Sequence, residues 1–118
     1  MIKVSVFYPN KPGARFDFDY YTATHLPLVR DKLGGACEGI AADKGIAGGS
    51  PDAAAPYIAI AHLYFESVDA FNQAFGPVAS DILGDIPNYT DLQPELQISE
   101  VLVNASRSEK GELRIPSR

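Results

Sequence analysis

The chain contains two histidines, and one of them, His25, lies in a segment whose residue types suit proton transfer. An unperturbed imidazole titrates at about pH 6.5, so it accepts and donates protons near neutrality. His25 follows Tyr20 and Tyr21, and either phenol group is able to hold a substrate oxygen. We therefore treat His25 as a candidate general acid/base, with Tyr21 as its candidate partner. The alternative is a structural histidine that ties a helix to a sheet, with at least one tyrosine packed in the core.

The second histidine, His62, shares one face of an alternating segment with Tyr64. If this face meets the helices, His62 approaches His25 across a common cavity. If the face meets a partner sheet, His62 is an interface residue, which is the reading we favour. Both His62 and Tyr64 are kept as candidate substrate-binding residues.

Other aromatic and polar side chains complete the candidate pocket. Phe18 and Phe75 lie on the apolar stripes of two expected helices, where they would form its walls. Asn88 and Tyr89 would line its mouth, although Asn after Pro also commonly satisfies the backbone of a turn. Asp85 is a carboxylate for which the sequence names no partner.

The sequence offers no set of metal ligands and no nucleotide loop. Two histidines without ligand spacing and the single cysteine, Cys37, do not make a closed site. No G-x-G-x-x-G fingerprint opens a helix. We expect no metal and no cofactor, and we expect Cys37 to be a small buried apolar residue.

The first helix must position His25. Asp17 is a suitable N-cap, and apolar residues recur at helical spacing until Gly34-Gly35 ends the helix. Pro27 lies inside it, has no N–H, and crowds the carbonyl four residues back. This proline predicts a kink or a break over residues 23–27, directly beside His25.

The remaining elements follow from alternation, helical spacing and turn residues. The expected strands are residues 1–8, 36–47, 57–65 and 96–103, and a second helix begins after Ser67, is interrupted at Gly76-Pro77 and precedes a loop over residues 84–91. The order strand, helix, strand, strand, helix, strand predicts an α+β, ferredoxin-like domain: a four-stranded antiparallel sheet with two helices on one face. The other face would remain bare, so we expect a homodimer that closes two sheets into a dimeric α/β barrel.

Length and charge narrow the class of protein. The 118 residues make one domain, assigned to residues 1–103, with a C-terminal tail over residues 104–118 whose composition is typical of a mobile segment. The net charge of −5 disfavours binding to nucleic acid or to an anionic membrane surface. No apolar run approaches the length of a membrane span, and one cysteine fits a reducing compartment, so we expect a cytoplasmic protein.

Two segments carry a resemblance to a known family. Phe18-Asp19-Tyr20-Tyr21 with His25-Leu26-Pro27-Leu28, and then Asp85-Ile86-Pro87-Asn88-Tyr89-Thr90-Asp91, resemble the EthD family, named for ethyl tert-butyl ether degradation. The resemblance covers most of residues 1–103. It implies a dimeric α/β barrel. Members of this family are often labelled reductases, and fungal relatives are linked to dehydration steps in polyketide pathways.

Two functions of different class remain open. The first is an enzyme or auxiliary enzyme without a cofactor, in which His25 performs acid/base chemistry on a small apolar, aromatic or polyketide-like compound. Dehydration, isomerisation and oxidation all fit such a site, so both a lyase/isomerase and an oxidoreductase remain open. The second is a small-ligand binding or carrier protein with the same pocket and no turnover.

Overall fold

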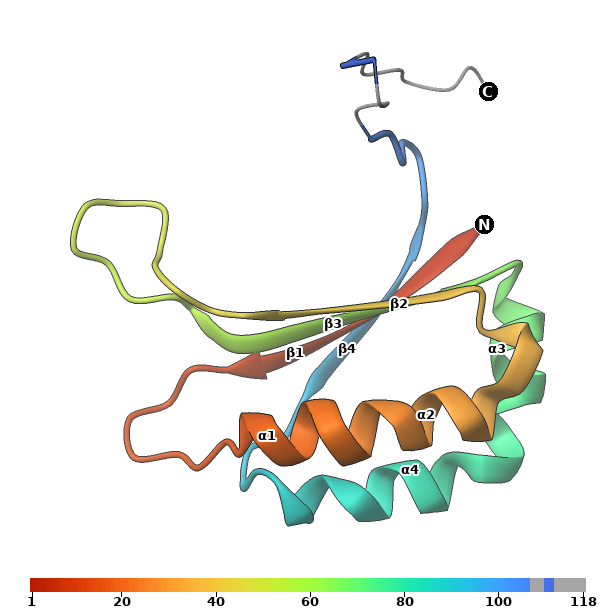
Figure 1. The fold of residues 1–118 in the computed structure, drawn as a ribbon, viewed down its shortest axis with the longest axis horizontal. Coiled ribbons are helices and arrows are strands. Elements are labelled where there is room, and N and C mark those ends of the chain that lie inside the picture. Colours follow the sequence, from red (N-terminus) through yellow and green to blue (C-terminus); the bar gives the residue numbers. More distant parts are fainter. Residues whose placement is uncertain (107–109, 112–118) are drawn as a thin grey trace.

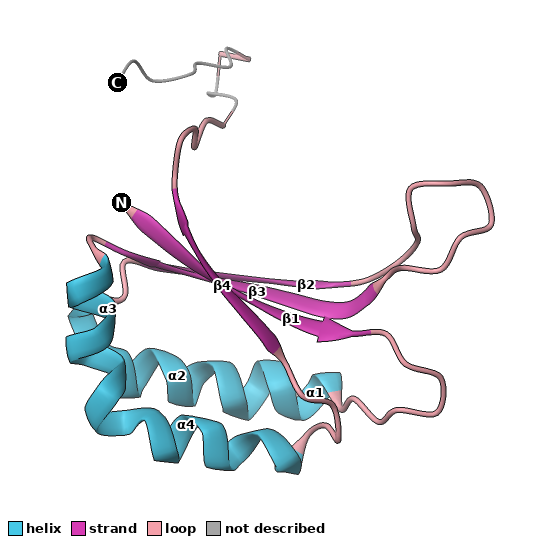
Figure 2. Cartoon of the chain, turned by 180° about the vertical axis from the view of Figure 1, so that it is seen from behind, coloured by secondary structure: helices cyan, strands magenta, loops and turns pink. Residues whose placement is uncertain are grey.

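The fold is a single antiparallel sheet covered by helices on one face, in a computed structural model that describes residues 1–106, 110 and 111. The four strands lie in the order β2-β3-β1-β4. They are β1 (Ile2–Pro9), β2 (Gly39–Lys44), β3 (Tyr57–Phe65) and β4 (Glu95–Glu100). The helices pack beneath this sheet in both views (Figure 1, Figure 2). The predicted α+β, ferredoxin-like arrangement is confirmed.

The first helical segment is continuous but changes its geometry along its length. It consists of α1 (Phe18–Tyr20), a π-helical segment η1 (Tyr21–His25) and α2 (Leu26–Leu33). The Asp17 carboxylate caps it by accepting a hydrogen bond from the backbone N–H of Tyr20 at 3.0 Å. It ends at Gly34, whose positive φ of 65° suits a residue without a Cβ.

The disturbance predicted beside Pro27 is present as a wider turn rather than a break. The backbone N–H of Leu26 donates to the carbonyl of Tyr21, five residues back. Pro27 has no backbone N–H to donate, so the change from π-helical to α-helical hydrogen bonding falls just before it. Tyr21 and His25 lie at the two ends of the π-helical segment, and both are buried.

The second helical segment bends at Gly76-Pro77, as the sequence indicates. It contains α3 (Val68–Phe75), the 3-10 turn η3 (Gly76–Val78), α4 (Ala79–Asp85) and a further 3-10 turn, η4 (Ile86–Asn88). One more 3-10 turn, η2 (Gly34–Ala36), follows α2 in the first helical segment. The prediction that a loop begins at Gly84 was wrong, since Gly84 and Asp85 complete α4. An exposed glycine costs a helix only about 1 kcal/mol, and the neighbouring Ile82 is buried in the core.

The last strand is shorter than predicted. It ends at Glu100 rather than at residue 103, because Glu100 pairs with Ile2 and the partner strand β1 begins there. Most of the expected C-terminal tail, residues 107–109 and 112–118, lies outside the described residues.

From Ala59 to Phe65 the alternation of β3 separates the two faces of the sheet as predicted; the pairing with β1 shifts before Ala59, and Tyr57 contacts Phe7. Ala59 and Ala61 are almost completely buried beneath the helices, where their small side chains permit close approach. The core also contains two groups of larger side chains: Val4, Val29, Leu33, Leu63, Phe65, Phe71 and Ile82, and separately Tyr8, Tyr21, Tyr89 and Leu92.

The opposite face of the sheet carries His62. Its Nδ1 shares a hydrogen bond with the Ser5 hydroxyl at 2.8 Å, and the two residues are directly opposed on β3 and β1. Because side chains alternate along a strand, His62 and Tyr64 point away from the helices. The cavity shared by His62 and His25, one of the two arrangements considered for this strand, is therefore not formed.

The cap of α3 provides a test of the local folding signals. The Ser67 hydroxyl accepts a hydrogen bond from the backbone N–H of Ala70 at 3.0 Å. We expect Ser67→Ala to lower the free energy of unfolding by about 1 kcal/mol, measured by urea denaturation. Ser80→Ala, at an exposed position of α4, is the matched control and should change it by less than about 0.5 kcal/mol. Equal effects of the two substitutions would contradict the capping role.

Candidate functional site

The carboxylate of Asp85 joins the residues that the sequence nominated for chemistry. As the last residue of α4, it accepts hydrogen bonds from the Tyr20 hydroxyl at 2.6 Å and from the Asn88 amide at 2.9 Å. Its second oxygen lies 2.9 Å from Nδ1 of His25. Three donors from α1, η1 and η4 thus converge on one carboxylate.

These contacts determine the charges of Asp85 and His25. Burial alone would raise the pKa of Asp85, but the hydrogen bonds from Tyr20, Asn88 and His25 outweigh it and hold that pKa below its ordinary value. Burial lowers the pKa of His25 more than the Asp85 carboxylate raises it. Near neutral pH the pair is therefore a neutral imidazole beside an ionised carboxylate.

The ionised carboxylate also decides which ring nitrogen carries the hydrogen. A carboxylate only accepts hydrogen bonds, so Nδ1 of His25 must donate to Asp85. In the neutral ring, Nε2 then holds the lone pair and is available as a base. No hydrogen bond to Nε2 is formed by the described residues.

Aromatic rings hold the imidazole in place. His25 is 4% exposed and lies nearly parallel to Tyr21, at 15° with ring centroids 5.9 Å apart. The Tyr89 ring packs closer, with its centroid 4.5 Å from that of His25. Tyr89 is itself anchored by a hydroxyl–hydroxyl hydrogen bond of 2.6 Å with Tyr8. The ring therefore has little freedom to turn away from Asp85.

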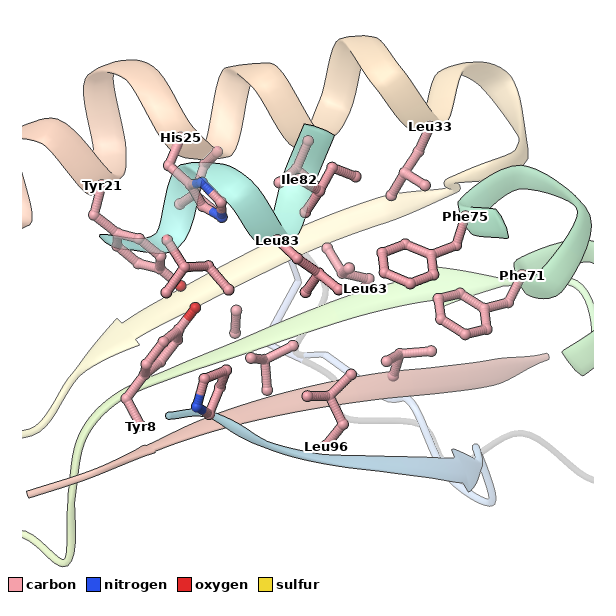
Figure 3. A pocket seen from close by; sticks show the side chains of 17 residues that line it. Tyr8, Tyr21, His25, Leu33, Leu63, Phe71, Phe75, Ile82, Leu83 and Leu96 are labelled. Carbon is pink, nitrogen blue, oxygen red and sulfur yellow. The ribbon is translucent and has the colours of Figure 1, made fainter. Parts of the chain in front are cut away.

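A cavity of about 60 Å³ lies between the helices and the sheet. At roughly 10–15 Å³ for each water, it has room for several waters or part of a small ligand. His25, Tyr21 and Tyr8 lie at one end, and Phe75 and Phe71 lie at the other (Figure 3). The rest of the lining is apolar: Val4, Val6, Leu26, Val29, Leu33, Ala61, Leu63, Ile82, Leu83, Ile86, Pro94 and Leu96.

Tyr21 has an unusual hydroxyl. Among the described residues it is the one buried side-chain nitrogen or oxygen atom that lacks a hydrogen-bond partner. Burial raises the pKa of Tyr21 far above its ordinary value, with a smaller contribution from Tyr8, so the hydroxyl remains protonated. It turns toward the Tyr8 hydroxyl at the His25 end of the cavity (Figure 3).

The cavity borders a surface hollow at the edge of the sheet. The two share Leu83, Ile86, Pro94 and Leu96 in their linings. Leu83 and Leu96 are 48% and 53% exposed, because β4 is an edge strand whose inner side is not fully covered by helices. The cavity therefore opens toward the gap between α4 and β4.

The structure brings together only part of the predicted site. His25, Tyr21 and Phe75 line the cavity. Tyr20, Asn88 and Tyr89 contact Asp85 or the His25 ring from outside the lining. Phe18 also lies outside it, where its ring centroid is 4.5 Å from that of Phe16, at a tilt of 40°, and the Lys44 ammonium lies over it. His62 and Tyr64 lie across the sheet.

Two residues of the site were missed as participants. Asp85 was left without a partner, although it lies three residues before Asn88 in the second motif, a spacing that places both on one side of a helical turn. Tyr8 was not nominated for the site, since nothing in the sequence indicated its contact with Tyr89, eighty-one residues away.

No three His, Cys, Asp or Glu side chains gather as metal ligands within the described part of the chain. The helices of that part are also too short or too polar to cross a membrane.

Comparison with solved structures gives relatives of the same fold. An EthD-like protein from Ralstonia eutropha JMP134 is 45% identical, with a TM-score of 0.83 over 86% of this chain and 92% of that one. An EthD family protein from Bacillus halodurans C-125 is 21% identical, with a TM-score of 0.60 over 86% and 98%. HapK from Hahella chejuensis shares the fold at 13% identity, with a TM-score of 0.56 over 90% and 98%. No curated protein matches the sequence.

The sequence also matches a family model across the region that contains the site. The model, described as the EthD domain, matches residues 14–93, which include His25, Tyr21 and Asp85. The match covers more than half of the chain and agrees with the 45% identical relative. The chain therefore belongs to the EthD family.

Proposed function

We propose that the protein performs acid/base chemistry at Nε2 of His25 on a small, largely apolar molecule, such as an aromatic or polyketide-like compound. One observation carries the proposal: Nδ1 of the buried His25 ring lies 2.9 Å from an oxygen of Asp85, and the same ring lines an apolar cavity. A buried base beside a pocket with few polar groups is typical of catalytic sites.

The chemical step follows from the charges. The Nε2 lone pair removes a proton from an acidic C–H or O–H bond of the bound molecule, and the ring becomes an imidazolium. The Asp85 carboxylate, 2.9 Å from Nδ1, stabilises that positive charge. Return of the proton to another atom completes an isomerisation, and its transfer to a departing hydroxyl completes a dehydration. Reaction of the deprotonated molecule with dioxygen would instead give an oxidation.

The second candidate is a binding or carrier protein with the same cavity. It is favoured by the small number of polar groups in the lining, where His25, Tyr8 and Tyr21 are accompanied only by apolar side chains. In this reading His25 orients a ligand without exchanging protons with it. Proton exchange therefore separates the two functions.

We also propose a homodimer through the open face of the sheet. Phe7, Ile60 and Tyr64 lie on that face of β1 and β3, beside the polar pair Ser5 and His62, and no helix covers it (Figure 2). An uncovered sheet face that carries several apolar side chains is costly to leave in water, and a second copy would cover it with two-fold symmetry.

Hydrogen–deuterium exchange tests the chemistry without knowledge of the natural substrate. We expect the wild-type protein to accelerate the loss of benzylic protons from small aromatic ketones such as phenylacetone in D₂O, followed by ¹H NMR. His25→Gln should slow this exchange by about a hundredfold or more, because it removes the base. His62→Gln, which changes the other histidine on the far face of the sheet, is the matched control and should leave the rate unchanged. Equal rates in wild type and His25→Gln would favour the binding protein.

Titration of the histidines by NMR tests the role of Asp85. We expect the pKa of His25 to lie below its ordinary value of about 6.5. Asp85→Asn should lower it further, since the carboxylate that raises it is lost while burial remains. The pKa of His62, on the other face of the sheet, should not change, and a His25 pKa above 6.5 in the wild type would contradict the neutral ring.

The lowered pKa of His25 also makes the stability of the folded state depend on pH. Because the pKa of His25 is lower in the folded than in the unfolded state, the unfolded state binds more protons as pH falls below about 6.5. The contribution of His25 to stability is therefore present above that pH and is lost as pH falls through the folded pKa. His62, whose pKa burial also lowers, contributes with the same sign.

Sedimentation velocity tests the proposed dimer. We expect a dimeric wild type and a monomeric Ile60→Glu variant, because the substitution puts a charge in the middle of the open face. Val68→Glu places the same charge on α3, at a 42% exposed position on the helical side, and should leave the dimer intact. A monomeric wild type would rule out the assembly.

A further inference from the structure

The hydroxyl of Tyr21 is kept in an unfavourable state that a ligand would relieve. Tyr21 is 2% exposed, and its oxygen has no hydrogen-bond partner among the described residues. A buried donor left unpaired costs roughly 1–3 kcal/mol. Phenylalanine would pack in the same place without this cost, so fold stability alone does not account for a tyrosine here.

The other tyrosine hydroxyls near His25 are already engaged. The Tyr20 hydroxyl donates to Asp85 at 2.6 Å, and those of Tyr8 and Tyr89 bind each other at 2.6 Å. One hydroxyl of the Tyr8–Tyr89 pair keeps its hydrogen, but both of their oxygens are already paired. Tyr21 is the hydroxyl without any partner, and its protonated phenol offers one hydrogen to an acceptor in the cavity.

The lining also restricts the charge of that molecule. The cavity has no Lys, Arg, Asp or Glu in its wall, and its side chains other than His25, Tyr8 and Tyr21 are apolar. Burying a charge without a partner is far more costly than burying one hydrogen-bonded oxygen. An anion or a cation is thus a poor fit, and an uncharged molecule is a good one.

We propose that the cavity takes an uncharged, largely apolar ketone whose carbonyl oxygen accepts a hydrogen bond from the Tyr21 hydroxyl at the His25 end. This inference rests on the proposed function of the same cavity and names its substrate class. In this assignment Tyr21 binds the carbonyl oxygen, and His25 removes the proton from the neighbouring C–H bond.

The placement of the two groups suits this division of roles. Tyr21 and His25 lie at the two ends of η1, with nearly parallel rings 5.9 Å apart, and both reach the cavity. Removal of a proton from the carbon next to the carbonyl breaks a C–H bond and transfers the proton to Nε2 of His25. The electron pair of that bond forms a C=C bond, and the carbonyl becomes an enolate oxygen. The hydrogen bond from Tyr21 strengthens as this oxygen gains charge.

A pair of probes with equal shape isolates the contribution of the oxygen. Cyclohexanone and methylenecyclohexane differ only in the exchange of a carbonyl oxygen for a CH₂ group, and binding of each is measured by NMR titration. We expect Tyr21→Phe to weaken the binding of cyclohexanone relative to that of methylenecyclohexane. The ratio of the ketone's dissociation constant to the alkene's should rise by roughly threefold to tenfold, which corresponds to the net value of one hydrogen bond. Tyr64→Phe removes the same atom on the far face of the sheet and should leave the ratio unchanged. Cyclohexanecarboxylate, an anion of similar shape, should bind at least tenfold more weakly than cyclohexanone.

A thermal unfolding experiment accompanies the titration. Tyr21→Phe should unfold at the same or a higher temperature than the wild type, since it removes an unpaired buried hydroxyl. An unchanged ratio in Tyr21→Phe, a clear fall in its unfolding temperature, equal binding of the carboxylate, or no binding of either neutral probe would each overturn the inference.

Failure of the ketone assignment is distinguishable from failure of the proposed acid/base chemistry. Proton exchange that depends on His25, together with a ratio that does not depend on Tyr21, leaves the acid/base function standing and removes the ketone assignment. A ratio that depends on Tyr21, without His25-dependent exchange, supports the ketone site in a binding protein.

Discussion

The hydrogen bond between Asp85 and His25 is the interaction on which the geometry of the site depends. It crosses between the two helical segments, from the end of α4 to the end of η1, over a sequence separation of 60 residues. Tyr20 and Asn88 both donate to the other oxygen of the same carboxylate, so its position and its charge are both fixed. A carboxylate held in this way determines the tautomer and the orientation of the ring that it binds.

Burial and charge act in opposite directions on His25, and the balance sets its chemistry. If the carboxylate effect were larger, His25 would be an imidazolium at neutral pH and could not accept a proton. With burial dominant, the pKa of His25 falls and the ring is neutral, yet Asp85 remains ready to stabilise a charge that develops there. Burial therefore keeps the ring in the neutral form that the proposed acid/base role requires, while it also makes the ring a weaker base.

Sequence patterns predicted the elements better than the contacts between them. Alternation located β1 and β3, and Asp17, Ser67 and Gly34 marked helix ends, because these signals are local. Pro27 predicted a disturbed helix, but a kink, a break and a π-helical turn differ in how Tyr21 and His25 pack, which depends on Tyr89. The partners of Asp85 and the cavity itself arise from packing across long sequence separations, and no single segment encodes them.

The cavity exists because two helical segments share a sheet that they do not fully cover. Small residues of β3, Ala59 and Ala61, allow the helices to approach the centre of the sheet, while Leu96 of the edge strand β4 is left half exposed. The interior is thus packed tightly around His25 and loosely toward β4. A site needs both properties, since a proton-transferring ring must be held still while its ligand needs a way in. The uncovered sheet edge leaves the side chain of Leu96 half exposed and borders the cavity, so the ligand of the proposed site would enter there.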